Sequence, residues 1–260
     1  MKRRALWESF YAFWQKGYTL SRFRLKTWVW HDPDLYGWLI AYFRPHRRSF
    51  CVGPETEICI EGFPRSGNSF VVMAFQLAQR RPVRIAHHQH VPAQILRAIR
   101  WHIPVLLLIR DPFEAVLSLK ALHLEILLRK QRRSLEYGIP FKDLFRAYVA
   151  FYRPLIPVLD ACVVAPFSQV TRDLGGFIHA VNRKFGTSFT PVDLTPENLQ
   201  KVRERLGFHA FHTDIRDELK EILWSEFQRE DPRTAEWLTQ ARRVYQEVLQ
   251  RATTPTKEVG

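Results

Sequence analysis

The sequence predicts an α/β protein with three layers, in which helices flank a parallel β-sheet of the P-loop type. Short apolar runs alternate with helical segments from residue 57 onward, and this alternation indicates a parallel sheet. The first apolar run, 58–60, leads through a glycine-bearing loop into a second apolar segment that starts at Val71. That order is typical of a strand, a loop and the start of a helix.

Four segments have the length and apolar character of buried strands: 57–61, 83–88, 103–110 and 161–166. Cys59 and Cys162 lie in two of these segments, so we expect both to be buried. Together with Cys51 they make an odd number of cysteines, without the spacing of a metal or redox motif. A reducing compartment is the simplest interpretation.

Capping residues predict where the helices begin and end. Asp111 and Pro112 supply an N-cap and a first-turn proline for a long helix that ends near Arg133. Thr171 and Gly186 bracket another helix as cap and stop. Because similar start signals recur downstream, we expect the C-terminal region to be helical. Two dipeptides carry these signals: Thr195-Pro196 and Asp231-Pro232.

Residues 1–50 differ from the rest, and we expect them to form a helical extension to a single α/β domain at 51–260. This segment holds ten Lys or Arg residues against three acidic ones, and five of the eight tryptophans. Such a helix either docks its aromatic face on the domain or contacts a membrane surface or an acceptor. Four aromatic residues recur at the spacing of one helix face: Trp7, Phe10, Tyr11 and Trp14.

The composition favours an anionic partner. Hydrophobic residues make up 46% of the chain, which excludes a disordered protein, and the net charge is +13. Nucleotides, nucleic acid, acidic glycans and anionic lipid headgroups all fit this charge. No apolar run approaches the roughly 20 residues of a spanning helix, and the basic start of the chain is not followed by a signal-peptide core. We expect a cytoplasmic protein, with peripheral membrane contact through the N-terminal segment as an alternative.

The loop after the first strand has Walker A spacing without the Walker lysine. Gly62 and Gly67 match the two glycines of GxxxxGK followed by Ser or Thr, and Ser69 matches the hydroxyl position, but Asn68 replaces the lysine. Successive loop N–H groups and a helix N-terminus form a cradle for an anion. Because Arg65 supplies a cation inside this loop, the sequence predicts a phosphate site here.

The end of the third strand predicts a second anion site. Arg110 should emerge on the same edge as the loop, since the carboxyl ends of parallel strands converge on the ligand crevice. Ser118 lies about 10 Å along the next helix from its cap, far enough to reach a different phosphate. Two separated sites indicate a nucleotide phosphorylated at both ends. A strand-end ion pair for Arg110 and a packing role for Ser118 are the alternatives.

These segments resemble the sulfotransferases that use 3′-phosphoadenosine 5′-phosphosulfate (PAPS). Pro64–Phe70 is similar to their 5′-phosphosulfate loop, P-K/R-S-G-T-T/S-W/L/F, and Arg110 with Ser118 is similar to their 3′-phosphate motif. The resemblance covers about residues 57–190 and implies a donor site that needs no metal. It assigns Arg65, Ser66, Gly67, Asn68, Ser69 and Phe70 to the 5′-phosphosulfate, and Arg110 and Ser118 to the 3′-phosphate.

The same resemblance implies a histidine base in a K-x-H-x-P setting. His90 fits that histidine by its distance from Pro92, and His88 then takes the lysine position, where it contacts the sulfonate or acts as a rival base. A neutral imidazole can accept a proton from an attacking hydroxyl at neutral pH. We expect both rings, at i and i+2 of an extended segment, to point into one pocket. A zinc site and a loop of incidental surface histidines are the alternatives.

The sequence thus predicts in-line sulfonate transfer to an acceptor hydroxyl, with His90 as base and Arg65 stabilising the leaving phosphate. The acceptor is a glycan, a lipid or a small molecule, and the aromatic residues of Tyr148–Tyr152 are candidates to contact it. Arg216 or Lys220 is the candidate to complete the 3′-phosphate site, because a basic, glycine-rich C-terminal segment is missing.

Two other function classes stay open. A P-loop kinase or nucleotidase would use Asp111 as a magnesium ligand, but Asn68 cannot replace the lysine cation. A non-catalytic basic module would bind an anionic glycan, lipid or nucleic acid through the N-terminal segment. No nucleic-acid-binding module is recognisable in the sequence, so we expect no nucleic-acid partner.

Overall fold

The computed structural model describes residues 21, 30, 32–43, 49–130, 139–207 and 213–253. Its centre is a four-stranded, fully parallel sheet with the order β2-β1-β3-β4. The predicted strands are confirmed; the first is shifted by one residue, and the other three are shorter than their predicted segments. The strands are β1 (Ile58–Gly62), β2 (Ile85–His87), β3 (Val105–Ile109) and β4 (Val163–Pro166).

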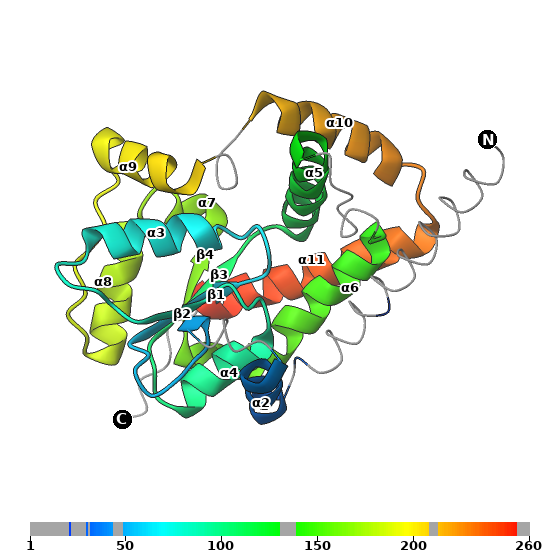
Figure 1. Cartoon of the computed structure of the whole chain (residues 1–260). Coiled ribbons are helices and arrows are strands. Elements are labelled where there is room, and N and C mark those ends of the chain that lie inside the picture. The colour runs from blue at the N-terminus through cyan, green and yellow to red at the C-terminus, as the bar shows by residue number, and fades with distance from the viewer. Residues whose placement is uncertain are drawn as a thin grey trace.

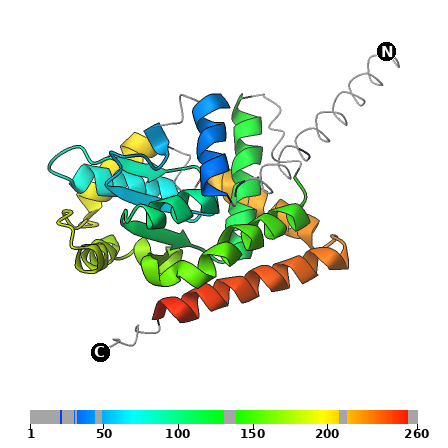
Figure 2. The same cartoon turned by 90° about the horizontal axis from the view of Figure 1, so that it is seen from below.

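Helices cover both faces of this sheet, which confirms the three-layer α/β fold (Figure 1). Figure 2 shows α11 lying along the outer side of the fold, where it contacts α6 and η3. The described helices are α2 (Pro33–Phe43), α3 (Asn68–Ala78), α4 (Pro92–Arg100), α5 (Pro112–Lys130), α6 (Phe141–Tyr152), η3 (Arg153–Ala161), α7 (Phe167–Val170), α8 (Leu174–Phe185), α9 (Pro196–Leu206), α10 (Asp214–Phe227) and α11 (Pro232–Thr253).

The two faces of the sheet bury separate hydrophobic cores. Alternate residues of β3 point to opposite faces, because side chains along a strand alternate. Leu106 and Leu108 join the core beneath α3, α8 and α9, whereas Leu107 and Ile109 join the core beneath α4, α6 and α11. Cys59 and Cys162 are buried in the second core, as predicted. Continuous apolar strands are therefore explained by burial on both sides.

Most predicted helix boundaries are confirmed, and one cap is wrong. Asp111 Oδ1 accepts from the backbone N–H groups of Phe113 and Glu114 at 2.9 and 3.0 Å, so it caps α5 as predicted. The cap of α8 is Asp173, which accepts from Gly176 N, and not Thr171. The Thr171 hydroxyl instead donates to the Phe167 carbonyl at 2.7 Å. The signals at 186, 195–196 and 231–232 end or begin helices as predicted.

The predicted aromatic face at residues 7–14 lies outside the described residues. Within the described part, α2 packs against α4 and exposes Trp38, Tyr42 and Phe43, whose rings contact one another. Contact of this region with a membrane or an acceptor, and the division at residue 50, stay predictions. None of the described helices combines the length and apolarity needed to cross a membrane.

Gly62 is required by the close approach of β1 to β3, and replacing it should destabilise the protein. A Cβ atom at this position would lie 2.4 Å from the Leu108 carbonyl oxygen. We expect Gly62→Ala to lower the free energy of unfolding by about 3 kcal/mol, measured by urea denaturation. Gly53→Ala is the control, because its Cβ would meet no atom closer than 4.0 Å. Equal stabilities of the two variants would contradict this assignment.

Candidate functional site

The loop between β1 and α3 has the geometry of an anion cradle. A turn closes when Ser66 N donates to the Phe63 carbonyl at 3.2 Å, and Arg65 and Gly67 adopt left-handed φ values of 69° and 97°. Gly67 is the N-cap of α3 and offers no side-chain acceptor, so the first N–H groups of the helix are not capped by it. Such a helix N-terminus attracts an anion.

The side chain of Asn68 holds the loop, which leaves its backbone N–H as the group that faces an anion. The side chain is 4% exposed, and its Nδ2 donates to the Phe63 carbonyl at 3.1 Å. Its Oδ1 is buried without a hydrogen-bond partner among the described groups. An oxygen acceptor cannot bind a phosphate oxygen, so the backbone N–H at the start of α3 is what this residue offers to an anion.

The structure brings the two predicted phosphate motifs together. Arg65 Nε donates to Ser118 Oγ at 3.0 Å, and Arg110 Nη1 donates to the Arg65 carbonyl at 3.2 Å. The second nitrogen of Arg110 donates to Glu114 at 3.2 Å, and its guanidinium lies over the Phe167 ring at 4.2 Å. Ser118 was expected to reach a separate phosphate; here it is buried against Arg65. The loop and the end of β3 therefore form one connected cationic site.

Burial makes the positive charges of this site less favourable than they would be in water. Burial, with repulsion from Arg216 and Arg110, lowers the pKa of Arg65 to about 10. Burial likewise lowers the pKa of Arg110. Both guanidinium groups stay charged at neutral pH, but each favours its charged form less than an exposed arginine does. A bound anion would relieve this repulsion, so the electrostatics suit a phosphate or a sulfate ester.

Of the two C-terminal candidates, Arg216 is the one that acts on Arg65. Its side chain is 3% exposed and forms a buried ion pair with Glu125 through Nε, at 2.9 Å, and Nη2. Thr213 also donates to Glu125, at 3.0 Å. Lys220 instead pairs with Asp217 on its own helix, at 2.8 Å. Glu125 therefore already occupies the Arg216 guanidinium. A ligand role for either residue stays a prediction.

The predicted histidines lie together at the end of β2, but not on an extended segment. His88 and His90 adopt left-handed φ values of 56° and 54°, which corrects the expected conformation. Their ring centroids are nevertheless 5.6 Å apart. His88 Nε2 contacts Ser69 Oγ at 2.9 Å, and His90 Nδ1 contacts the Gly62 carbonyl at 2.8 Å. Both histidines are therefore tied directly to the anion-binding loop.

The hydrogen bonds of His90 define its proton positions. A carbonyl oxygen can only accept, so His90 Nδ1 must donate to Gly62, and in the neutral ring Nε2 carries the lone pair. His87, whose Nδ1 contacts His88 Nδ1, cannot compete as a base at neutral pH. Burial, together with His88 and Arg84, lowers the pKa of His87 to about 4. His90 has the protonation pattern that a general base requires.

Two tyrosines of α6 hold both motif segments, which sequence reasoning missed. Tyr148 and Tyr152 are fully buried, so they cannot contact an acceptor as expected from the aromatic pattern. Tyr148 donates to the Arg110 carbonyl at 2.7 Å. Tyr152 donates to the Leu108 carbonyl at 2.8 Å and accepts from Phe63 N at 3.1 Å. Burial raises the pKa of both hydroxyls, so they stay protonated and can donate.

Removing the Tyr152 hydroxyl should weaken the site more than removing the Tyr148 hydroxyl. Tyr152→Phe leaves the buried Phe63 N–H without its acceptor and costs the bond to Leu108, so we expect a loss of about 2 kcal/mol. Tyr148→Phe loses one donated bond, and we expect about 1 kcal/mol. Urea denaturation of both variants measures this difference. A smaller effect for Tyr152 than for Tyr148 would show that the hydroxyl does not hold the loop.

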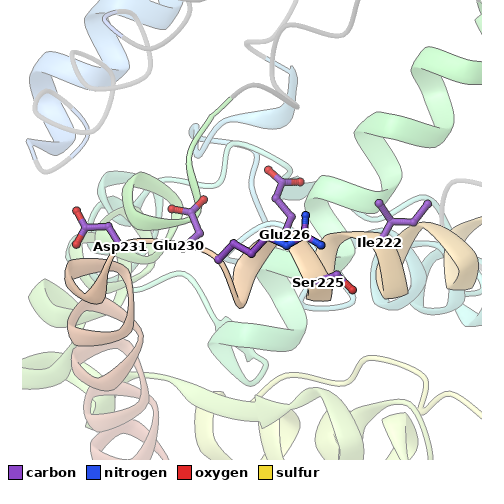
Figure 3. A pocket seen from close by; sticks show the side chains of 6 residues that line it. Ile222, Ser225, Glu226, Glu230 and Asp231 are labelled. Carbon is purple, nitrogen blue, oxygen red and sulfur yellow. The ribbon is translucent and has the colours of Figure 1, made fainter.

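A separate pocket of about 540 Å³ lies at the end of α10 and the start of α11 (Figure 3). It contains none of the predicted site residues. Three of its six lining residues are acidic and only one is basic, which does not suit a phosphorylated nucleotide. Its lining residues are Ile222, Ser225, Glu226, Arg229, Glu230 and Asp231. Across the described ranges, no three His, Cys, Asp or Glu side chains converge as a metal site requires.

Neither a protein-family model nor a curated protein matches the sequence. Among solved structures, the chain is similar to mouse sulfotransferase SULT7A1 complexed with PAP, with a TM-score of 0.39 and 10% sequence identity. That similarity covers 80% of this chain and 88% of the mouse chain. The cationic site described above depends only on contacts within this chain.

Proposed function

We propose that this protein transfers a sulfonate group from PAPS to an acceptor hydroxyl. One observation carries the proposal: the glycine-bearing loop and its flanking residues contact both Arg110 and the two histidines, His88 and His90. Arg110 reaches the loop through the Arg65 carbonyl, and His90 reaches it through the Gly62 carbonyl. Binding of the donor phosphate and removal of the acceptor's proton could therefore occur on either side of the transferred sulfonate, as in-line transfer demands.

Donor binding is assigned to the residues of the loop and of the adjacent strand end. Arg65 and the N–H groups of residues 67–70 would hold the 5′-phosphosulfate, since they combine a cation with a helix N-terminus, whereas the Ser66 N–H closes the turn. Arg110 and Ser118 would hold the 3′-phosphate, and Ser118 would exchange its contact with Arg65 for the phosphate. The side chain of Arg110 is 17% exposed, which leaves its guanidinium accessible to a ligand.

The reaction needs a base, a stabilised leaving group and little else. His90 takes the acceptor's proton at Nε2 while the acceptor oxygen forms its bond to sulfur. The bond between sulfur and the 5′-phosphate oxygen breaks, and the electron pair leaves with 3′,5′-diphosphoadenosine (PAP). Arg65 and the loop N–H groups stabilise the charge that develops on that phosphate. His88, which contacts Ser69, would contact the transferred sulfonate.

The rival kinase or nucleotidase function fits these contacts less well. Asp111, its candidate magnesium ligand, uses Oδ1 to cap α5. The Asn68 amide, at the Walker lysine position, donates to a backbone carbonyl. A neutral amide fixed in this way cannot neutralise β- and γ-phosphates.

An acceptor screen tests the proposed reaction. The full chain is incubated with isotopically labelled PAPS and panels of phenolic, sugar and lipid hydroxyls, and mass spectrometry detects an added sulfonate. We expect a labelled product with at least one acceptor class and none with His90→Gln. Phosphoryl transfer from ATP, or a product that forms equally with the variant, would contradict the proposal.

A further inference from the structure

Glu61 is a buried carboxylate in a strand that is otherwise apolar. It precedes Gly62 at the end of β1, and its side chain is 0% exposed. Acidic side chains are rarely fully buried unless they are paired or hydrogen-bonded. The reaction proposed above gives this residue no role, so its burial calls for a separate explanation.

The partners of Glu61 belong to the histidine loop and to the strand end. Oε2 accepts from Gln89 N at 2.8 Å, and Oε1 lies 3.4 Å from Gly62 N and 3.4 Å from His90 Nδ1. All three contacts are with nitrogens that donate. A carboxylate satisfies such an arrangement, whereas an amide would turn its own NH₂ group toward a donor.

The loop that Glu61 holds is strained. Gln89 stands between His88 and His90, and both histidines have positive φ, which is unfavourable for residues with a side chain. A strained loop persists when the surrounding structure fixes it. The Glu61 carboxylate fixes this loop at its middle, through Gln89 N, and at its end, through the His90 ring.

We propose that Glu61 is the positioning residue of His90, a role that rests on the proposed function of His90 as base. Glu61 and the Gly62 carbonyl together hold the Nδ1 proton, which directs the lone pair to Nε2. When Nε2 takes the acceptor's proton, the ring becomes positive, and the adjacent Glu61 carboxylate balances that charge. Among the described residues, the titratable groups near the ring include His88, from the same loop, and beyond it His87, from β2.

Glu61→Gln tests the charge while keeping the size of the side chain. Because a carboxylate 3.4 Å away favours the charged ring, we expect the His90 titration midpoint to fall by about one pH unit in this variant. The acid limb of the kcat profile should move to lower pH by the same amount. We expect kcat itself to fall at least about tenfold, because the base is weaker, with KM for PAPS unchanged. Glu57→Gln is the control, since Glu57 pairs with Arg81 at the surface.

Nuclear magnetic resonance of ¹⁵N-histidine-labelled protein measures the midpoint without any substrate, and His90→Gln assigns the signal. An unchanged midpoint in a folded Glu61→Gln variant overturns the proposal. If that variant does not fold, Glu61→Asp replaces it, because the shorter carboxylate keeps its charge but moves it away from the His90 ring. A lower His90 midpoint in Glu61→Asp supports the proposal, and an unchanged midpoint overturns it. If the midpoint shifts but wild-type protein transfers no sulfonate, the interaction of Glu61 with His90 is supported and only the proposed function is contradicted.

Discussion

Arg65→Met is expected to weaken nucleotide binding strongly without destabilising the fold. The Arg65 guanidinium is largely buried, and repulsion from Arg216 and Arg110 adds to the cost of burial, so its charge opposes folding. Methionine preserves much of the side-chain length and removes the charge. We expect the affinity for PAP to fall about a hundredfold, as the loss of charge-assisted hydrogen bonds predicts. The free energy of unfolding should stay within about 1 kcal/mol of wild type or increase, although the bond to Ser118 is lost.

Calorimetric titration with PAP and urea denaturation measure the two quantities separately. Arg81→Met is the matched control, because Arg81 is an exposed arginine that pairs with Glu57 away from the loop. That variant should bind PAP as wild type does. If Arg65→Met unfolds more easily and still binds PAP, Arg65 is a structural residue and the cationic site is misassigned.

His90→Gln is expected to remove turnover while leaving donor binding intact. His90 contacts the loop through the Gly62 carbonyl, and in the proposed reaction its Nε2 accepts the proton, so glutamine would retain a donor to Gly62 but no base. We expect kcat to fall by about 10²- to 10⁴-fold, the usual contribution of a general base, with PAP affinity unchanged. Single-turnover rates with saturating donor and the acceptor found in the screen measure this loss.

His88→Gln separates the two candidate bases. His88 contacts Ser69 and lies beside His90, so its loss should lower turnover less than the loss of His90 and should weaken donor binding more. If His88→Gln abolishes turnover and His90→Gln does not, the base is His88.

The fold could be predicted from the sequence because its signals are local. The strands are continuous apolar runs, and burial on both faces of the sheet requires such runs. Asp111, Thr195 and Asp231 cap helices at the positions where their residue types predict caps. The cap of α8 was mistaken because Thr171 and Asp173 are both good capping residues, and their spacing alone does not distinguish them.

The site was predicted less completely because its geometry depends on contacts between distant residues. Arg65 and Ser118 are 53 positions apart, and their direct contact follows from the packing of α5 against the loop. The positive φ values at His88 and His90 have no residue-type signal, since histidine does not require them. Glu61, which accepts from the Gln89 N–H between them, lies 28 positions before Gln89.

The burial of Tyr148 and Tyr152 could not be predicted from the sequence either. Aromatic residues four positions apart on a helix form the same pattern whether they face a core or a ligand. Only the arrangement of α6 beneath β3 shows that these hydroxyls bind backbone carbonyls. Their role is to hold the two motif segments in place.

Calorimetric titration of the full chain with PAP, AMP and ATP, each with and without magnesium, tests the central claim most directly. The cationic site joins the loop to Arg110, so a nucleotide with phosphates at both the 3′ and 5′ positions should bind best. We expect one PAP per chain, with AMP and ATP at least about tenfold weaker, as the loss of one charged contact predicts. Preferential, magnesium-dependent binding of ATP would contradict a sulfotransferase site.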